Sequence, residues 1–394
     1  MTHRAIGVSE TVPISQRGHL QSTGNLLAHI AMDRVRNHQP VYRLDVGQPS
    51  DGAPQKALDA LNQIDHIQNL GYTVSVGQVE LRERIAKHYQ QSYGISVSAN
   101  EIACCVGASQ ALAMVCFACL DVGDTMAIVL PCYPAYRDIF NMSGLAIHDI
   151  ITSLDNDFKC TAADIQALPK GVKAILITNP SNPTGAIYTQ QELLDIHQAC
   201  QEKDILLISD EIYHGVVYDG LKVFSMAGMA NTVVINSFSK YYAMPGWRLG
   251  WVTATEEVVS SISNMSRSWY ISPPNASQVV ALHAMDCQDE LNQHIIKYEA
   301  NRALLMDQLP KMGMDHFIKP SGAFYVYARI KHLKEDSIDF CKQLLTETGV
   351  CIAPGSLFDH VNGHHDVRIS YAGTTSELQE ALEKMADWMS KKFN

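Results

Sequence analysis

Residues 237–251 read S-F-S-K-Y-Y-A-M-P-G-W-R-L-G-W and follow the apolar run T-V-V-I at residues 232–235. The run predicts a buried strand, and the residues rich in hydroxyl groups, glycine and proline behind it predict a turn. This turn places Lys240 eight positions before a second cation, Arg248. A lysine that attacks a carbonyl carbon must be held still and partly desolvated, because only its neutral amine is a nucleophile. Lys240 is therefore a candidate for covalent catalysis, and the alternative is a solvated loop lysine.

The same order of elements recurs along the chain. Apolar runs at residues 102–106, 125–130, 172–178 and 205–209 each end in a turn rich in glycine, proline, asparagine or acidic residues. Helical patterns follow, for example at residues 111–120 and 190–203. Strands and helices that alternate in this way predict an α/β fold with a mostly parallel sheet flanked by helices. Because ligands bind outside the carboxyl ends of such strands, the turns predict one shared site.

The pattern changes near residue 287. A charged helical stretch at 289–309 precedes the strand-like K-P-S-G-A-F-Y-V-Y-A-R-I, a helix at 337–348, the run V-R-I-S-Y and a closing helix. This order of predicted strands and helices indicates a second, smaller α+β domain. The helical pattern near residues 25–37 does not by itself belong to either domain.

Composition narrows the class of protein. The chain has 394 residues, 46% of them hydrophobic, with a formal net charge of −11 and a mean hydropathy of −0.06. An acidic chain without a long apolar stretch is expected to bind neither nucleic acid nor a membrane. The motif C-F-A-C at residues 116–119 has no second cysteine pair, so no metal site is expected. Without a visible signal peptide, a cytoplasmic location is expected.

Three further turns carry candidate chemistry. V-G-A-S-Q at residues 106–110 opens a helix, where backbone amides can bind an anion or simply form a tight turn. Asp210 follows a buried strand and needs a cationic or donor partner, unless it caps the next turn. N-P-S-N-P-T-G at residues 179–185 has two prolines that hold Asn182 in place, or is purely structural.

Together these motifs resemble class I aminotransferases, the fold type I pyridoxal-phosphate enzymes. N-P-S-N-P-T-G, S-D-E-I-Y at residues 209–213 and the lysine segment occur in that family's order. The likeness extends from D-V-G-Q-P at residue 45 to V-R-I-S-Y at residue 371. It implies a large cofactor-binding domain at residues 42–286 and a small domain formed by residues 1–41 and 287–394. The implied activity is transfer of an amino group between an L-amino acid and a 2-oxo acid, with ping-pong kinetics.

The resemblance also implies roles for individual residues. Lys240 forms a Schiff base with pyridoxal 5'-phosphate and then moves the substrate's α-proton. Asp210 pairs with the ring nitrogen, Asn182 and Tyr213 bind the phenolic oxygen, and Tyr133 stacks on the ring. Lys240, Asp210 and Tyr213 are thus the predicted catalytic residues. The implied phosphate ligands are the backbone of Ala108 and Ser109, the hydroxyls of Ser237 and Ser239, and the Arg248 guanidinium.

For the substrate, the resemblance implies that Arg368 grips the α-carboxylate, assisted by Gly47 and Asn182. Tyr72 matches a tyrosine that reaches the phosphate of the neighbouring subunit, so a homodimer with shared sites is implied. The chain has G-Q-P-S-D at residues 47–51 where the family commonly has G-E-P-D-F, and Ser109 stands where some aspartate-specific members carry lysine. Both departures count against a dicarboxylate preference.

Two questions stay open at the level of sequence. A carbon–sulfur β-lyase or an amino-acid decarboxylase on the same fold would use the same cofactor, and a non-catalytic regulator would need an added DNA-binding domain that is not visible. The substrate's side chain is also open. Arg267, Trp269 and residues 14–18 are candidates for its pocket, although Arg267 fits a solvated helix position better.

Overall fold

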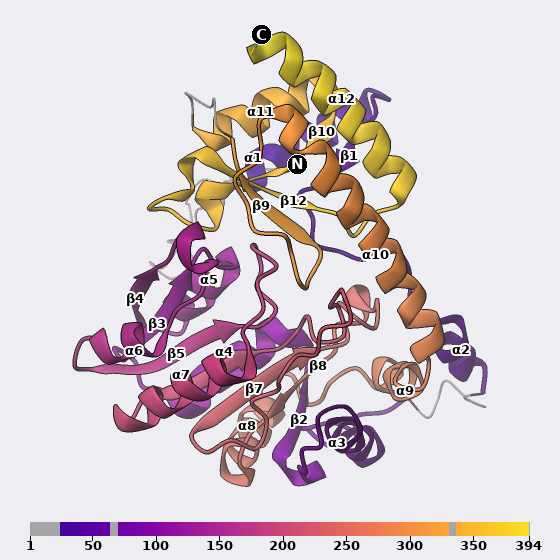
Figure 1. The fold of residues 1–394 in the computed structure, drawn as a ribbon. Coiled ribbons are helices and arrows are strands. Elements are labelled where there is room, and N and C mark those ends of the chain that lie inside the picture. The colour runs from indigo at the N-terminus through magenta and orange to yellow at the C-terminus, as the bar shows by residue number, and fades with distance from the viewer. Residues whose placement is uncertain (1–23, 64–69, 331–335, 394) are drawn as a thin grey trace, which may run out of the picture.

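The structure, a computed structural model, describes residues 24–63, 70–330 and 336–393 (Figure 1). Its centre is a seven-stranded sheet in the order β2-β8-β7-β6-β5-β3-β4. Only β8 runs antiparallel to its neighbours, β7 and β2. The strands are β2 (Ile102–Cys105), β3 (Thr125–Leu130), β4 (Ala146–Ile151), β5 (Val172–Thr178), β6 (Leu206–Asp210), β7 (Thr232–Ser237) and β8 (Gly250–Thr253). The sheet is therefore mostly parallel, as the sequence predicted.

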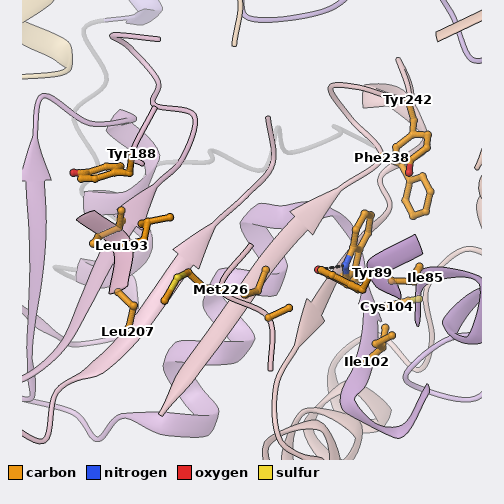
Figure 2. Close-up of a cluster of buried hydrophobic side chains, with 14 of the residues drawn as sticks. Ile85, Tyr89, Ile102, Cys104, Tyr188, Leu193, Leu207, Met226, Phe238 and Tyr242 are labelled. Carbon is orange, nitrogen blue, oxygen red and sulfur yellow. Dashed lines mark hydrogen bonds between the residues drawn. The ribbon is translucent and has the colours of Figure 1, made fainter. Parts of the chain in front are cut away.

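Helices cover both faces of this sheet. Side chains alternate along each strand, so that Leu207 packs toward one face and Ile208 toward the other. The first face is covered by α3 (Val79–Tyr93), α6 (Ala162–Ala167), α7 (Gln190–Glu202) and α9 (Asn275–Ala284), and the second by α4 (Gly107–Cys119), α5 (Pro134–Met142) and α8 (Glu256–Trp269). Figure 2 shows part of the first face, with Ile85 and Tyr89 of α3 beside Ile102 and Cys104 of β2. Burial on both faces explains the continuous apolar runs in the sequence.

A third core belongs mainly to the C-terminal part of the chain, which lies above the central sheet in Figure 1. A small antiparallel sheet has the order β11-β12-β9, and β1 pairs with β10 in parallel. These strands are β1 (Tyr42–Arg43), β9 (Tyr325–Arg329), β10 (Val350–Cys351), β11 (Ala353–Pro354) and β12 (Asp366–Ser370). The helices around them are α1 (Gly24–Arg36), α10 (Gln288–Gln308), α11 (Ser337–Thr348) and α12 (Thr375–Phe393). The short helix α2 (Gln55–Leu58) packs near α9 instead.

The α/β class, the strands at residues 125–130 and 172–178, and the helix at 337–348 are confirmed. Strands β4 and β8 were not predicted. β4 is a half-exposed edge strand that carries His148 and Asp149, and β8 has only four residues and begins at a glycine. Near the predicted domain boundary, Tyr42 and Arg43 pair with β10, so this segment lies against the C-terminal part.

Two general properties of the described residues complete the fold. All ten cysteines are free thiols, and Cys119 alone among them is not fully buried. Among the helices in the described ranges, none combines the length and the apolar composition that a membrane crossing needs.

Candidate active site

A cavity of about 420 Å³ lies at the carboxyl ends of β5, β6 and β7, beside the N-terminus of α4. Its wall contains every predicted site residue except Ser237 and Tyr72. The predicted residues that line it are Gly47, Ala108, Ser109, Tyr133, Asn182, Asp210, Tyr213, Ser239, Lys240, Arg248 and Arg368. Segments that are far apart in sequence thus meet at one place, as expected for the switch region of a parallel sheet.

Lys240 lies in the turn that follows β7 and points into the cavity. Its Nζ donates a hydrogen bond to the Gly47 carbonyl oxygen at 2.6 Å and lies 5.9 Å from the centre of the Tyr213 ring. Burial lowers the pKa of Lys240 to about 8, helped by the charges of Arg368 and Arg248 and opposed by Asp210. About a tenth of the amine is therefore neutral, and nucleophilic, at pH 7, far more than for an ordinary lysine.

Asp210 is the last residue of β6. Its Oδ2 accepts a hydrogen bond from the Tyr136 hydroxyl at 2.6 Å, and its Oδ1 accepts one from the Ile212 amide at 3.0 Å. Burial raises the pKa of Asp210 to about 6, although both hydrogen bonds and Lys240 lower it. Asp210 thus caps the next turn and also lines the cavity. A structural role as a cap and a role in the site are therefore compatible.

A cradle that suits an anion forms where α4 begins. Gly107 has a φ of +79°, and Ala108 and Ser109 follow it in the first helical turn, where backbone amides are unpaired. The Arg248 guanidinium packs against Gly107 so closely that an added Cβ would lie 2.4 Å from its Nη2. Ser239 lines the same cavity. Amides, a hydroxyl and a guanidinium together suit a phosphate group.

Ser237 and Tyr72 lie elsewhere. The Ser237 hydroxyl lies 3.0 Å from the Leu249 carbonyl oxygen and accepts a hydrogen bond from the Ser239 amide at 3.1 Å, so it supports the cradle from behind. Tyr72 is 81% exposed on the surface. Within this single chain, Tyr72 therefore does not reach the cavity.

Arg368 reaches the cavity from β12. Its guanidinium is sandwiched between the rings of Tyr325 and Phe358, at 4.4 and 4.5 Å from their centres. Nη1 donates to Asn182 Oδ1 at 3.1 Å, Nη2 donates to the Asp45 carbonyl oxygen, and the buried Nε has no partner among the described residues. The cation is thus fixed in place and retains a free donor.

Sequence reasoning missed two tyrosines in this wall. Tyr136 follows Tyr133 by three residues on α5, and helical spacing could have shown that both belong to one face. The Tyr325 hydroxyl lies 2.7 Å from the Tyr213 hydroxyl. Nothing local in the strand-like run around Tyr325 indicates this contact, because it joins β9 to the turn after β6.

Of the candidates for the substrate's side-chain pocket, Arg267 and Trp269 do not line the cavity. Arg267 on α8 donates to Asn264 Oδ1 at 2.5 Å at an exposed position, which agrees with its reading as a solvated helix residue. Trp269 is 56% exposed. Residues 14–18 lie outside the described ranges. In the part of the chain that is described, no three His, Cys, Asp or Glu side chains gather as a metal ion would require.

Comparison with known proteins agrees with this geometry. The sequence model of the family described as aminotransferase class I and II matches residues 39–385. The valine–pyruvate aminotransferase of Mycobacterium tuberculosis is 38% identical over 363 residues, which cover 91% of this chain and 94% of that protein. An aspartate aminotransferase of Bacillus subtilis is 31% identical and covers 89% and 92%. The crystal structure of an aminotransferase from Mycobacterium tuberculosis superposes with a TM-score of 0.93 at 36% identity, over 97% of this chain and 100% of that one.

Proposed function

The chain belongs to the aminotransferase class I and II family and is an aminotransferase, and from this premise we propose that its cavity binds pyridoxal 5'-phosphate at Lys240. The observation that carries the proposal is the convergence of Lys240, Asp210 and the cradle at Gly107 and Arg248 in one cavity. The relatives named above are aminotransferases, and they give no support to a β-lyase or a decarboxylase.

The residues present fit this cofactor part by part. An aldehyde needs an amine with a lowered pKa, which Lys240 has. A phosphate needs amides and a cation, which the start of α4 and Arg248 offer. A protonated ring nitrogen needs a carboxylate, and buried Asp210 in turn gains from a cationic partner, since burial alone disfavours its charge. Tyr213 and Asn182 lie in the same wall as candidate donors to the ring oxygen.

The bound cofactor would supply an electron sink for the substrate's α-carbon. In the proposed mechanism the Asp210 carboxylate would pair with the protonated ring nitrogen, and Arg368 with Asn182 would orient the substrate's α-carboxylate. The Lys240 amine holds the cofactor and then removes and returns the α-proton. The walls of the cavity exclude water while the proton moves.

We propose an L-amino acid and a 2-oxo acid as substrates, used in two successive half-reactions. The relative with 38% identity is named for valine and pyruvate, so this pair is the first to test. In the described wall the only cationic side chains are Lys240, Arg248 and Arg368, all of which already have proposed partners. This supports a donor with an uncharged side chain over a dicarboxylate.

We also propose a homodimer with shared sites. Phe117 of α4 and Trp269 of α8 are exposed apolar side chains whose ring centres lie 5.4 Å apart. The backbone next to exposed Tyr72 is held to the segment after α8, where the Thr73 amide donates to the Ser272 hydroxyl at 3.2 Å. Such a patch on a soluble enzyme suits a second copy of the chain, which would bring Tyr72 to the partner's phosphate cradle. The domain boundaries at residues 42–286 and the cytoplasmic location remain parts of this proposal.

The decisive experiment replaces Lys240. Lys240→Ala should abolish turnover together with the visible cofactor absorbance that borohydride removes, because no other amine lines the described wall. Arg368→Ala serves as the comparison and should keep that absorbance while KM for the amino acid rises about 100-fold, as expected for loss of a charge-assisted pair. Full activity of Lys240→Ala would refute the proposal. Steady release of ammonia or carbon dioxide by wild type without a 2-oxo acid would favour the lyase or the decarboxylase.

A further inference from the structure

We propose that Glu211 and His214 form a buried positioning pair, which holds the backbone of residues 210–213 from the side opposite the cavity and so aims Asp210 and Tyr213 at the cofactor. This inference rests on the proposed function. Asp210 and Tyr213 line the cavity, whereas Glu211 and His214 do not. Neither member of the pair would touch the cofactor or the substrate, so both would act through their neighbours.

The alternation of β6 explains the two directions. Ile208 packs in the core beside α4 and α5, and Asp210 follows it on that face, where Tyr136 of α5 reaches it. Leu207 packs in the core beside α3 and α7, and Glu211 continues that face. Figure 2 shows Leu207 and Met226 close to each other on this side of the sheet. The Glu211 amide donates to the Ile235 carbonyl oxygen at 2.8 Å, which extends the pairing of β6 with β7.

Glu211 is completely buried, and three donors hold its carboxyl group. The Ser225 hydroxyl binds Oε2 at 2.6 Å, the Met226 amide binds Oε1 at 2.7 Å, and the Ser209 hydroxyl binds Oε1 at 3.1 Å. These donors belong to β6 and to the loop that precedes β7. Glu211 therefore ties the end of β6 to a loop about fifteen residues away, behind the Asp210 backbone, and this connection opposes any rotation of the strand end.

His214 fixes the other end of the turn. Its amide donates to the Glu211 carbonyl oxygen at 2.9 Å, and its Nδ1 lies 3.0 Å from the Tyr93 hydroxyl and 3.3 Å from Glu211 Oε2. Burial lowers the pKa of His214 to about 3 and raises that of Tyr93 well above its ordinary value. The ring is therefore neutral, and Tyr93 keeps its proton and can donate it to Nδ1. The backbone of Tyr213 thus lies in a turn that His214 fastens to Tyr93 of α3, and its hydroxyl lies 2.7 Å from the Tyr325 hydroxyl.

The titratable groups around the pair come from three elements. Asp210 lies on β6, the turn supplies His214 itself, and α3 contributes His88, Tyr89 and Tyr93. Among these groups only Asp210 carries a charge at neutral pH, since burial lowers the pKa of His88 to about 4 and raises the pKa values of both tyrosines. No cation therefore pairs with Glu211 within this set, and its attachment depends on hydrogen bonds.

The test combines activity with the visible circular dichroism of the bound cofactor, which reports the orientation of the ring. Glu211→Ala removes the carboxyl group that accepts all three hydrogen bonds. We expect kcat to fall at least about tenfold, KM for the amino acid to change little, and the visible band to lose intensity. Glu211→Gln keeps the shape and an acceptor oxygen and should restore most of both signals. Tyr93→Phe should produce a smaller change in the same direction.

Glu192→Ala is the matched control. Glu192 also accepts a backbone amide, from Thr189 at 2.7 Å, and an ammonium, but it lies at the start of α7 outside the cavity. Glu192→Ala should have a lower melting temperature than wild type, with kcat and the visible dichroism of the cofactor unchanged. If Glu211→Ala behaves in the same way, the pair is merely structural and the inference is overturned. If Glu211→Ala fails to fold, unchanged dichroism in Tyr93→Phe overturns it. Loss of the cofactor itself from wild type would instead count against the proposed function.

Discussion

The Tyr136 hydroxyl makes the shorter of the two hydrogen bonds that the Asp210 carboxylate accepts, at 2.6 Å against 3.0 Å for the Ile212 amide. It lowers a pKa that burial has raised to about 6, so Tyr136→Phe should raise the pKa of Asp210 further. Because a charge-assisted hydrogen bond contributes about 1.5–3 kcal/mol, the shift should be on the order of one pH unit. Because the proposed mechanism needs the ionised form of Asp210, the acidic limb of the pH–kcat profile should move to higher pH.

The control for this change is Tyr188→Phe. Tyr188 is equally buried and its hydroxyl accepts the Cys160 amide at 3.0 Å, but it does not line the cavity. This variant should lower the melting temperature and leave the pH profile in place. An unmoved acidic limb in Tyr136→Phe would show that other groups determine the ionisation of Asp210.

At this same scale, sequence and structure differ in an informative way. Lys240, Asp210 and Asn182 could be predicted because each follows a strand in a distinctive turn. Tyr325 could not, because its contact with Tyr213 joins β9 to the turn after β6. For Tyr136, helical spacing indicates the face that it shares with Tyr133 but not its contact with Asp210. A local pattern carries no information about which distant side chain a hydroxyl will meet. The roles of all site residues remain proposals that the variants above test.

At the scale of elements, the first turn of α4 depends on having no side chain at Gly107. An added Cβ would lie 2.4 Å from Arg248 Nη2, and the φ of +79° is itself unfavourable for alanine. Gly107→Ala should therefore weaken cofactor binding at least about tenfold, through displacement of Arg248 from the cradle. The measurement is a titration of the cofactor-free protein with pyridoxal phosphate.

Gly94→Ala separates backbone strain from this clash. Gly94 ends α3 with a similar φ of +71°, and no atom lies within 4 Å of its added Cβ. It should lose stability by about 1 kcal/mol and keep its cofactor affinity. Equal affinity losses in both variants would mean that strain, and not the displaced guanidinium, is responsible.

Elements also show where a sequence pattern is and is not sufficient. A long buried strand such as β5 can be predicted from its uninterrupted apolar run, and the helix α11 from its capped amphipathic pattern. β4 cannot, since an edge strand keeps polar residues on its exposed positions. β8 cannot either, because four residues are too few to establish a period. The direction of β8 in the sheet follows from tertiary pairing alone.

At the scale of the whole molecule, the proposed homodimer makes a prediction about Trp269. Trp269→Asp places a charge in the exposed apolar patch, which should dissociate the dimer and lower cofactor affinity together, because Tyr72 would no longer reach a partner. Sedimentation velocity and a cofactor titration check both effects. Ile296→Asp is the control, since Ile296 is exposed to a similar degree, at 58%, on α10 away from that patch. A Trp269→Asp dimer of normal affinity would contradict the proposed interface.

The antiparallel strand β8 has one more consequence. It pairs with β7 so that Ser237 lies opposite Gly250, and with β2 so that Gly250 lies opposite Cys105, and both registers anchor the two ends of the lysine segment in the same buried sheet. A residue inserted or deleted between these anchors would have to be taken up by the turn itself, which would move Lys240 relative to Arg248 in the cavity. The length of this stretch therefore matters to the site as well as the identity of its residues. The spacing from Lys240 to Arg248 is thus constrained by the strand pairing on either side of it.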